Sequence, residues 1–205
     1  MRSGNNQAGK DRLSAARFKP NQNMKSLKLT LVAFGVASAA ATLFAVQNPM
    51  VGGAPMYANK NIIQNAVNSK DHTTLVAAVK AAGLVDTLEG KGPFTVFAPT
   101  NEAFGKLPAG TVDTLLKPEN KQKLAGILTY HVAAGKWTAK KLMDQIKADG
   151  GSTSIKTVNG ETLTAKLQNG GVQLTDAKGG TAMVTIPDVM QSNGIIFVID
   201  TVLMP

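Results

Sequence analysis

The residues most often used in catalysis and metal binding are scarce in this chain. It contains no cysteine and two histidines, His72 and His131. Without thiols, cysteine nucleophiles, thiolate zinc sites, iron–sulfur clusters and disulfide bonds are excluded. The two histidines are far apart in the sequence, so a zinc site would also need carboxylates that the fold brings beside them. We predict no metal site, and we expect His72, at a predicted helix start, to be solvated.

Short patterns that resemble catalytic motifs lack the context that their chemistry needs. Residues 150–154, GGSTS, approximate a nucleophile elbow, but the final glycine is missing and the pattern precedes a strand. Gly90-Lys91-Gly92 begins a dinucleotide-binding pattern that Thr95 interrupts. Two convergent carboxylates could still hydrolyse a glycosidic bond, and the sequence leaves this alternative open. We predict that the protein is not an enzyme and has no cofactor.

The positive charge of the chain is concentrated near its N-terminus. The 22 lysines and arginines and the 13 acidic residues give a net charge of +9, and residues 1–58 hold seven of the basic residues but one of the acidic ones. The remainder has the charge balance of an ordinary soluble surface. One tryptophan and two tyrosines also offer few platforms for stacking bases. These features disfavour a nucleic-acid-binding function.

Residues 24–45 have the pattern of a signal peptide. Lys25 and Lys28 precede an uncharged apolar run, residues 29–46, whose second half is rich in alanine. An uncleaved signal anchor is the alternative, because the run is close to the shortest length that spans a membrane. The small residues that could precede a cleavage site are Ala39, Ala41 and Ala45.

The segments on either side of this leader have no apolar period. Residues 1–23 precede Met24 and are basic and polar, so we interpret them as an N-terminal extension or the result of a misplaced start codon. Residues 46–58 contain two prolines and two glycines and are interpreted as a linker. The folded domain is therefore expected to span residues 59–205.

The first half of this domain, to about residue 147, is predicted to be mainly helical. Apolar side chains recur there at the spacing of a helix face, and Gly83 stands where a helix would end. Residues 93–99, PFTVFAP, are closed by proline at both ends and favour a strand instead. The expected helices lie around residues 62–67, 75–82, 111–116, 118–128 and 139–146, with Thr111 and Thr138 as N-terminal caps and Pro118 in a first turn.

After Gly150-Gly151 the pattern changes to the alternation and regular turns of an antiparallel sheet. Asn-Gly pairs at residues 159–160 and 193–194 are strong hairpin signals, because both central residues of a type I′ turn need positive φ. The last apolar run is expected to be a central strand buried on both faces. The expected strands are residues 154–158, 162–167, 172–174, 182–186 and 195–203.

Four segments spaced along the chain resemble the fasciclin domain family. FTVFAPTNEAF (94–104) resembles its first signature and NGIIFVIDTVLMP (193–205) its second. Between them, LTYHVAAGK (128–136) resembles its tyrosine–histidine stretch and TVNGETLTA (157–165) its central hairpin. The resemblance implies an α+β fold, a fasciclin-like wedge in which a twisted antiparallel β-sandwich is packed by several short helices. It also implies an adhesion-type function rather than catalysis.

We interpret the two signatures as structural: their residues pack a strand against the helix that follows it. Phe94 and Phe97 should lie on opposite faces of the strand. Thr100 or Asn101 would cap the helix that follows, and Phe104 would fold back onto the strand. The residues assigned to this structural role are Phe94, Phe97, Pro99, Thr100, Phe104, Asn193, Gly194 and Asp200.

Tyr130 and His131 have two interpretations. The resemblance implies that they take part in receptor contact, whereas the apolar residues around them favour a buried tyrosine ring and a hydrogen-bonded interior histidine. We favour the buried arrangement. The family usually places a histidine in the second signature, where this chain has Phe197, so His131 must find a different hydrogen-bond partner.

Pro187-Asp188-Val189-Met190 resembles the Glu-Pro-Asp-Ile-Met integrin-contact motif of animal fasciclin domains, which implies a binding role for these four residues. Ile186 occupies the glutamate position, so Asp188 is the remaining carboxylate for a receptor's divalent cation. In the alternative interpretation, which we favour, Asp188 closes a turn by accepting backbone N–H bonds.

These observations predict an exported, non-catalytic interaction module. We expect it to be secreted, periplasmic or at the cell surface, to be a monomer, and to contact a membrane only through an uncleaved leader. The expected partner is an extracellular or cell-surface protein or a matrix component, and the candidate contact loops are residues 130–135 and 187–193. The alternative is a carrier of an apolar ligand such as a carotenoid or a lipid. Its pocket would be lined by Met143, Met183, Met190 and Met204.

Overall fold

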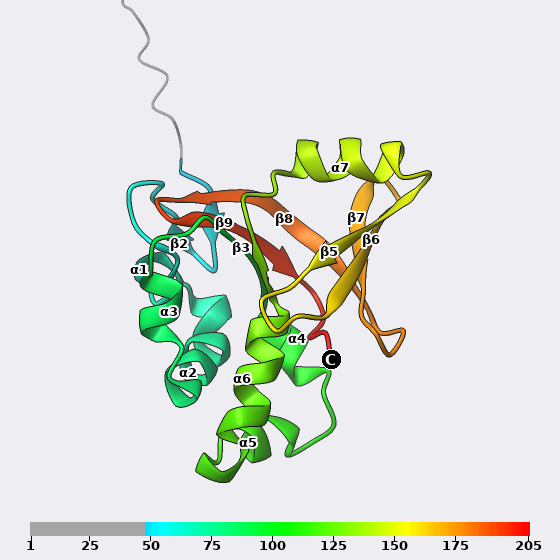
Figure 1. The fold of residues 1–205 in the computed structure, drawn as a ribbon. Coiled ribbons are helices and arrows are strands. Elements are labelled where there is room, and N and C mark those ends of the chain that lie inside the picture. The colour runs from blue at the N-terminus through cyan, green and yellow to red at the C-terminus, as the bar shows by residue number, and fades with distance from the viewer. Residues whose placement is uncertain (1–47) are drawn as a thin grey trace, which may run out of the picture. The chain divides into compact units, whose positions relative to one another are not determined.

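Helices dominate the chain before residue 131 and strands dominate it after residue 150 in the computed structural model, which describes residues 48–205 (Figure 1). The predicted α+β class is therefore confirmed. The helices are α1 (Ile62–Ala66), α2 (Thr73–Ala82), α3 (Val85–Glu89), α4 (Asn101–Gly105), α5 (Thr111–Leu115), α6 (Lys121–Tyr130) and α7 (Ala139–Ala148), with 3-10 turns at Lys70–His72 and Pro118–Asn120. The strands are β1 (Met50–Val51), β2 (Ala54–Pro55), β3 (Phe94–Pro99), β4 (Val132–Ala134), β5 (Ser152–Lys156), β6 (Thr162–Gln168), β7 (Gly171–Thr175), β8 (Thr181–Gln191) and β9 (Gly194–Ile199).

One seven-stranded sheet has the order β4-β3-β9-β8-β7-β6-β5. Its neighbours are antiparallel except β3 and β9, which run parallel with Phe94 opposite Gly194 and Pro99 opposite Ile199. Every residue of β9 is buried, so the prediction of a central strand is confirmed. The parallel pair was not predicted, because hairpin signals identify only strands that follow one another.

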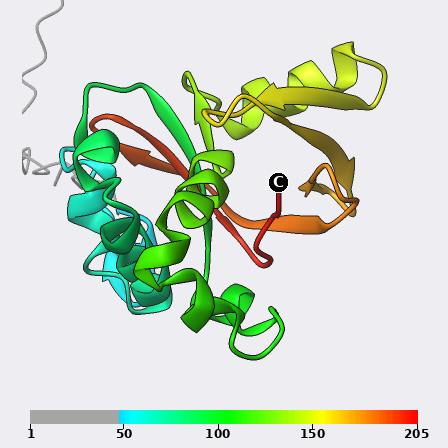
Figure 2. The same cartoon turned by 60° about the horizontal axis from the view of Figure 1, so that its bottom comes forward.

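The sheet curls until its two outer strands meet. Ala133 of β4 forms a bridge with Thr157, and the N–H of Val158 donates to the carbonyl of Val132 at 2.7 Å. Two register shifts in β8, between Val184 and Val189, let this long strand pair with β7 at its start and with β9 at its end. Figure 2 shows the resulting bend, from the yellow strands to the orange β8.

Hydrophobic clusters fill both faces of the central strands because successive side chains of a strand point in opposite directions. On one face, Val96 and Ala98 of β3 pack in a cluster with the helices before β4. On the other face, Phe97 packs in a second cluster with the curled strands and α7. Complete burial of a side chain such as Phe97 contributes about 1.5–3 kcal/mol. The predicted division of β3 into two faces is confirmed.

Most predicted helix boundaries are confirmed. Gly83 ends α2 with φ of 71°. The hydroxyl of Thr138 caps α7 by accepting the N–H of Lys141 at 3.1 Å. The prediction for Thr111 was wrong: this residue lies inside α5, and Gly110, with φ of 77°, occupies the capping position without a side-chain bond.

The segment interpreted as a linker, residues 46–58, is folded over the part that the structure describes. Its strands β1 and β2 form a hairpin whose Val51 and Met56 are 4% and 2% exposed within the helix-side cluster. The hairpin lies so close to the turn before α2 that a Cβ on Gly52 would be 2.3 Å from Ser69 Oγ. The spacing of apolar residues did not predict this hairpin, because a strand of two residues is too short to show a periodic pattern.

The predicted leader, residues 24–45, and the predicted extension, residues 1–23, lie outside the described residues. Between residues 48 and 205, the helices are too short or too polar to span a membrane.

Candidate functional site

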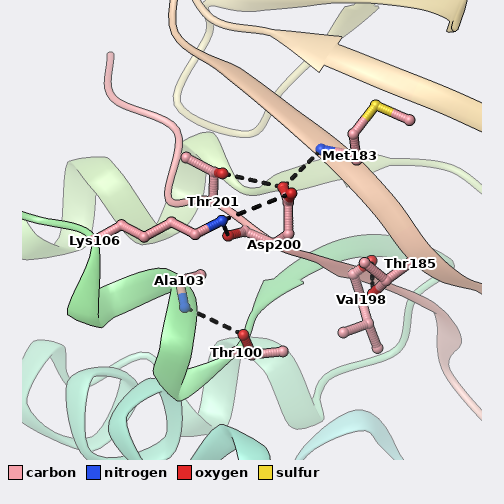
Figure 3. A network of polar contacts seen from close by, with 8 residues as sticks. All are labelled: Thr100, Ala103, Lys106, Met183, Thr185, Val198, Asp200 and Thr201. Atoms are coloured by element: carbon pink, nitrogen blue, oxygen red, sulfur yellow. Dashed lines mark hydrogen bonds and ion pairs between the residues drawn. The ribbon is translucent and has the colours of Figure 1, made fainter.

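The ends of the two signatures meet in a polar corner (Figure 3). The hydroxyl of Thr100 caps α4 by accepting the N–H of Ala103 at 3.2 Å, as predicted for this position. Lys106, one turn later, donates to the backbone carbonyl of Asp200 at 2.7 Å. The Asp200 carboxylate in turn accepts the N–H of Met183 at 2.8 Å and the Thr201 hydroxyl at 3.0 Å. These bonds connect β3, α4, β8 and β9, so this corner is structural.

The opposite ends of the same strands are joined by Asn193. Its side-chain NH₂ donates to the carbonyls of Leu88 at 2.7 Å and Gly90 at 3.1 Å, while its oxygen accepts the N–H of Ile62 at 3.1 Å. The next residue, Gly194, has no room for a side chain, because a Cβ would be 2.2 Å from the Phe94 carbonyl oxygen. Both residues therefore hold the parallel register of β3 and β9.

Tyr130 and His131 are buried, as we favoured from the sequence. The Tyr130 hydroxyl donates to the carbonyl of Thr162 at 3.2 Å and accepts the N–H of Ala177 at 3.1 Å, and burial raises the pKa of this side chain. His131 Nδ1 lies 2.8 Å from the Ile127 carbonyl, and its Nε2 accepts the N–H of Leu203 at 3.1 Å. Because it is desolvated, the pKa of His131 falls to about 4, so the imidazole is neutral at pH 7.

Phe197, at the family's usual histidine position, packs against Phe97 with ring centroids 5.8 Å apart. His131 obtains its two hydrogen bonds from backbone groups instead. With exposures of 0% for Tyr130 and 2% for His131, these residues contribute almost no accessible surface in this fold. A contact role for them remains a prediction from the resemblance alone.

The other histidine is also buried, contrary to our expectation of a solvated residue. His72 is 3% exposed, its Nδ1 lies 2.9 Å from Ser69 Oγ, and its Nε2 has no hydrogen-bond partner among the described residues. Burial lowers the pKa of His72. The charged residue Asp71 beside it favoured an exposed position for His72. The hairpin formed by residues 50–55, however, is folded close to this turn.

The segment 187–190 lies on β8, at its irregular part, rather than in a turn. Asp188 has φ of 55°, which is uncommon for a residue other than glycine. Its Oδ1 accepts the N–H of Ala139 at 2.7 Å, so it binds the first turn of α7. Accepting a backbone N–H agrees with the interpretation that we favoured, although the donor is a helix and not a turn. Pro187 is exposed, Asp188 and Met190 are half-buried, and Val189 is buried.

A surface segment that sequence reasoning missed, residues 135–141, lies beside Asp188. Thr95 fixes its start: the Thr95 hydroxyl donates to the Gly135 carbonyl at 2.8 Å and accepts the N–H of Trp137 at 3.0 Å. Trp137 is half-buried, with Lys141 Nζ 4.5 Å from its ring centroid. The available signal was that Trp137 is the only tryptophan and directly follows the tyrosine–histidine stretch.

Two open depressions flank this segment. One, of about 520 Å³, has Lys136 at its rim and lies between the loop before β3, the start of α1 and the turn between β8 and β9. The other, of about 410 Å³, lies on α7 and includes Thr138, Lys140 and Lys141. Part of the predicted contact loop 187–193 therefore borders the first depression, through residues 191–193.

The apolar cavities between the helices and the sheet are much smaller, at about 20–30 Å³ each. Such volumes are close to that of one water molecule. The four methionines of the carrier hypothesis do not line any one of them: Met143 and Met190 pack at the edge of the second cluster, and Met204 against the first. Nothing in residues 48–205 favours the carrier. In the same residues, no three His, Cys, Asp or Glu side chains gather as a metal site.

Comparison with known proteins agrees with this architecture. The family model for the fasciclin domain matches residues 70–205. Protein sll1483 of Synechocystis sp. is 44% identical over 184 residues, which cover 83% of this chain and 95% of that relative. The cell surface glycolipoprotein MPB83 of Mycobacterium bovis is 35% identical over 168 residues, covering 79% of this chain and 69% of the relative.

A solved structure of a FAS1 domain pair from the insect cell adhesion molecule fasciclin I has the same fold. The TM-score is 0.63 at 21% identity, over 71% of this chain and 51% of that chain. The family match extends from the turn before α2 through both signatures, and the strands that carry them lie side by side as the fold requires. The chain therefore belongs to the fasciclin domain family.

Proposed function

We propose that this protein is an exported, non-catalytic interaction module that binds an extracellular or cell-surface protein or a matrix component. The observation that carries the proposal is the surface formed where Asp188 of β8 accepts the N–H of Ala139 in the first turn of α7 at 2.7 Å. There the exposed Pro187 lies on β8, and the half-buried Trp137 lies in the loop before α7, where Thr95 accepts its backbone N–H at 3.0 Å. Binding residues held in this way lose little conformational freedom when a partner docks.

The relatives support the extracellular setting. One is named a cell surface glycolipoprotein, and the fold neighbour is a cell adhesion molecule. The leader pattern of residues 24–45 would direct this chain through a membrane, which places it in the periplasm, at the cell surface or in the medium. Whether the leader is cleaved decides between a free monomer and one tethered at residues 29–46.

The polar side chains of the second signature and of the tyrosine–histidine stretch support a binding rather than a catalytic role. Asp200, His131 and Asn193 direct their polar atoms at backbone groups of the domain itself. Groups used in this way are occupied by the fold and are not free to transfer protons to a substrate.

The test combines cell fractionation with a binding measurement. We expect the native protein in the envelope or medium, and we expect binding to the host's own cell-surface or matrix material to fall when Pro187 and Asp188 are replaced together by Ala and Asn. Asp188→Asn keeps an oxygen that can accept the Ala139 N–H, so the fold is retained. Asp113→Asn, at an exposed position on α5, is the matched control. A native protein found in the cytosol would contradict the proposal, as would unchanged binding by the double variant.

A further inference from the structure

The segment from the end of β4 through the first turn of α7, residues 135–141, combines a fixed backbone with side chains that the fold leaves available. Thr95 holds Gly135 and Trp137, Thr138 caps α7, and Asp188 accepts the N–H of Ala139. A loop held by four hydrogen bonds at 2.7–3.1 Å is already ordered before a ligand arrives.

Trp137 gives this segment an apolar anchor. The ring packs against the second core cluster and remains partly exposed, as do Met143 of α7 and Met190 of β8. Tryptophan is enriched among the residues that dominate protein interfaces, and methionine is enriched at interfaces as well. Each of these three side chains lies at the edge of that cluster with part of its surface uncovered.

The charges beside Trp137 are positive and largely uncompensated. Lys140 is paired with Asp144 at 2.5 Å, but Lys136 and Lys141 form no ion pair within residues 48–205. The nearby carboxylate, Asp188, is already engaged with the backbone of α7. A partner that approaches this surface is therefore attracted through carboxylates.

The position of Lys141 distinguishes between acidic ligands. Its ammonium lies 4.5 Å from the centroid of the Trp137 ring and covers one ring face, while the core cluster packs against the side chain. A flat sugar ring would have to displace this cation to stack on the indole. A peptide can bring an apolar side chain to the ring edge and a carboxylate to Lys141, and the depressions of about 520 and 410 Å³ on either side leave room for its continuation.

We propose that residues 135–141, with Trp137 at the centre and Lys136 and Lys141 beside it, dock an acidic peptide segment that carries an apolar side chain. This proposal rests on the proposed function and names the partner chemistry of that surface.

The single tryptophan makes the test site-specific, because the emission of the chain's indole reports this surface directly. Protein purified from its own host is titrated with a short peptide rich in Glu that contains two Leu residues. We expect a change in Trp137 emission that weakens with added salt. The Lys136→Gln/Lys141→Gln variant should bind about three- to tenfold more weakly, as expected for two exposed charge pairs. Lys123→Gln, an exposed position on α6, should bind like the unmodified protein.

Three further probes decide the class of ligand: the same peptide with Gln in place of Glu, heparin, and vesicles containing an anionic lipid. The proposal is overturned if the Glu peptide gives no emission change, if the Gln peptide binds equally well, or if only heparin or vesicles respond. It is also overturned if Lys123→Gln weakens binding as much as the double variant. Binding of the Lys136→Gln/Lys141→Gln variant to host surface material, measured in parallel, separates the two proposals. Undiminished binding removes this docking site but leaves the interaction function.

Discussion

The signature corner around Asp200 and the surface segment 135–141 use hydrogen bonds for opposite purposes. At the corner, Lys106 and the carboxylate of Asp200 bind groups of other elements, so the polar side chains themselves hold the strands and α4 together. In the segment, Thr95 and Asp188 fix the backbone, while the Trp137 and Lys136 side chains are left facing outward or only half-buried. The family signatures therefore hold the sheet and helices together, and we call this hydrogen-bonded and buried part the frame. The segment 135–141, outside the two signatures, presents the candidate surface.

The largest expected difference between the frame and the surface is in how much the free energy of unfolding falls when an aromatic ring is removed. Phe97→Ala should lower the free energy of unfolding by about 3–5 kcal/mol, because the fully buried ring leaves a cavity between β3 and Phe197. Trp137→Ala should cost about 1 kcal/mol, since its side chain is only partly buried. Urea denaturation of both variants measures the two values, and equal costs would mean that Trp137 belongs to the frame.

Acid should weaken the frame through its buried histidines. The pKa of His131 is about 4 in the folded protein and 6.5 in the unfolded chain, so between these values the unfolded chain binds more protons. The free energy of unfolding should therefore fall as the pH is lowered from 6.5 to 4, by about 3 kcal/mol for this residue. The lowered pKa of His72 acts in the same direction.

His131→Gln separates this effect from the titration of carboxylates, because glutamine donates and accepts hydrogen bonds without changing its charge. Its free energy of unfolding should depend less steeply on pH than that of the unmodified protein over this interval. Identical pH profiles for the two proteins would show that His131 does not titrate on unfolding.

A smaller difference is expected between two glycines. Gly194→Ala should cost about 1–3 kcal/mol, because the added Cβ would be 2.2 Å from the Phe94 carbonyl oxygen and would force β9 away from β3. Gly126→Ala, inside α6 with nothing within 4 Å of the added Cβ, should stabilise the protein by about 0.5–1 kcal/mol. Thermal unfolding compares them, and a gain from both substitutions would show that the parallel register is not tightly constrained.

Local patterns were sufficient to predict most of the elements that make up the frame. The alternation in FTVFAPTNEAF predicted the two faces of β3, and the hydroxyl of Thr100 and the position of Gly83 predicted where helices begin and end. Features that depend on distant segments were not predicted. The parallel pairing of β3 with β9, the burial of His72 close to the hairpin and the contact of Asp188 with α7 each join residues that no local pattern relates.

The candidate surface was harder to predict than the frame for the same reason. Asp188 was singled out by a motif, but Trp137 comes from a different part of the chain, and the bond from Ala139 to Asp188 that joins the two segments has no local sequence signal. The family resemblance raised a contact role for Tyr130 and His131, but the apolar residues around them correctly favoured burial with internal hydrogen bonds.

The parallel pairing of β3 and β9 also governs when the domain can fold. Residues 94–99 have no strand on that side until residues 194–199 have been synthesised, so the central contact closes a loop that includes most of the domain. Loops of this size slow the search for native contacts. A ribosome-bound chain that still lacks β9 therefore has no completed sheet, because β9 is the strand that joins β3 to β8.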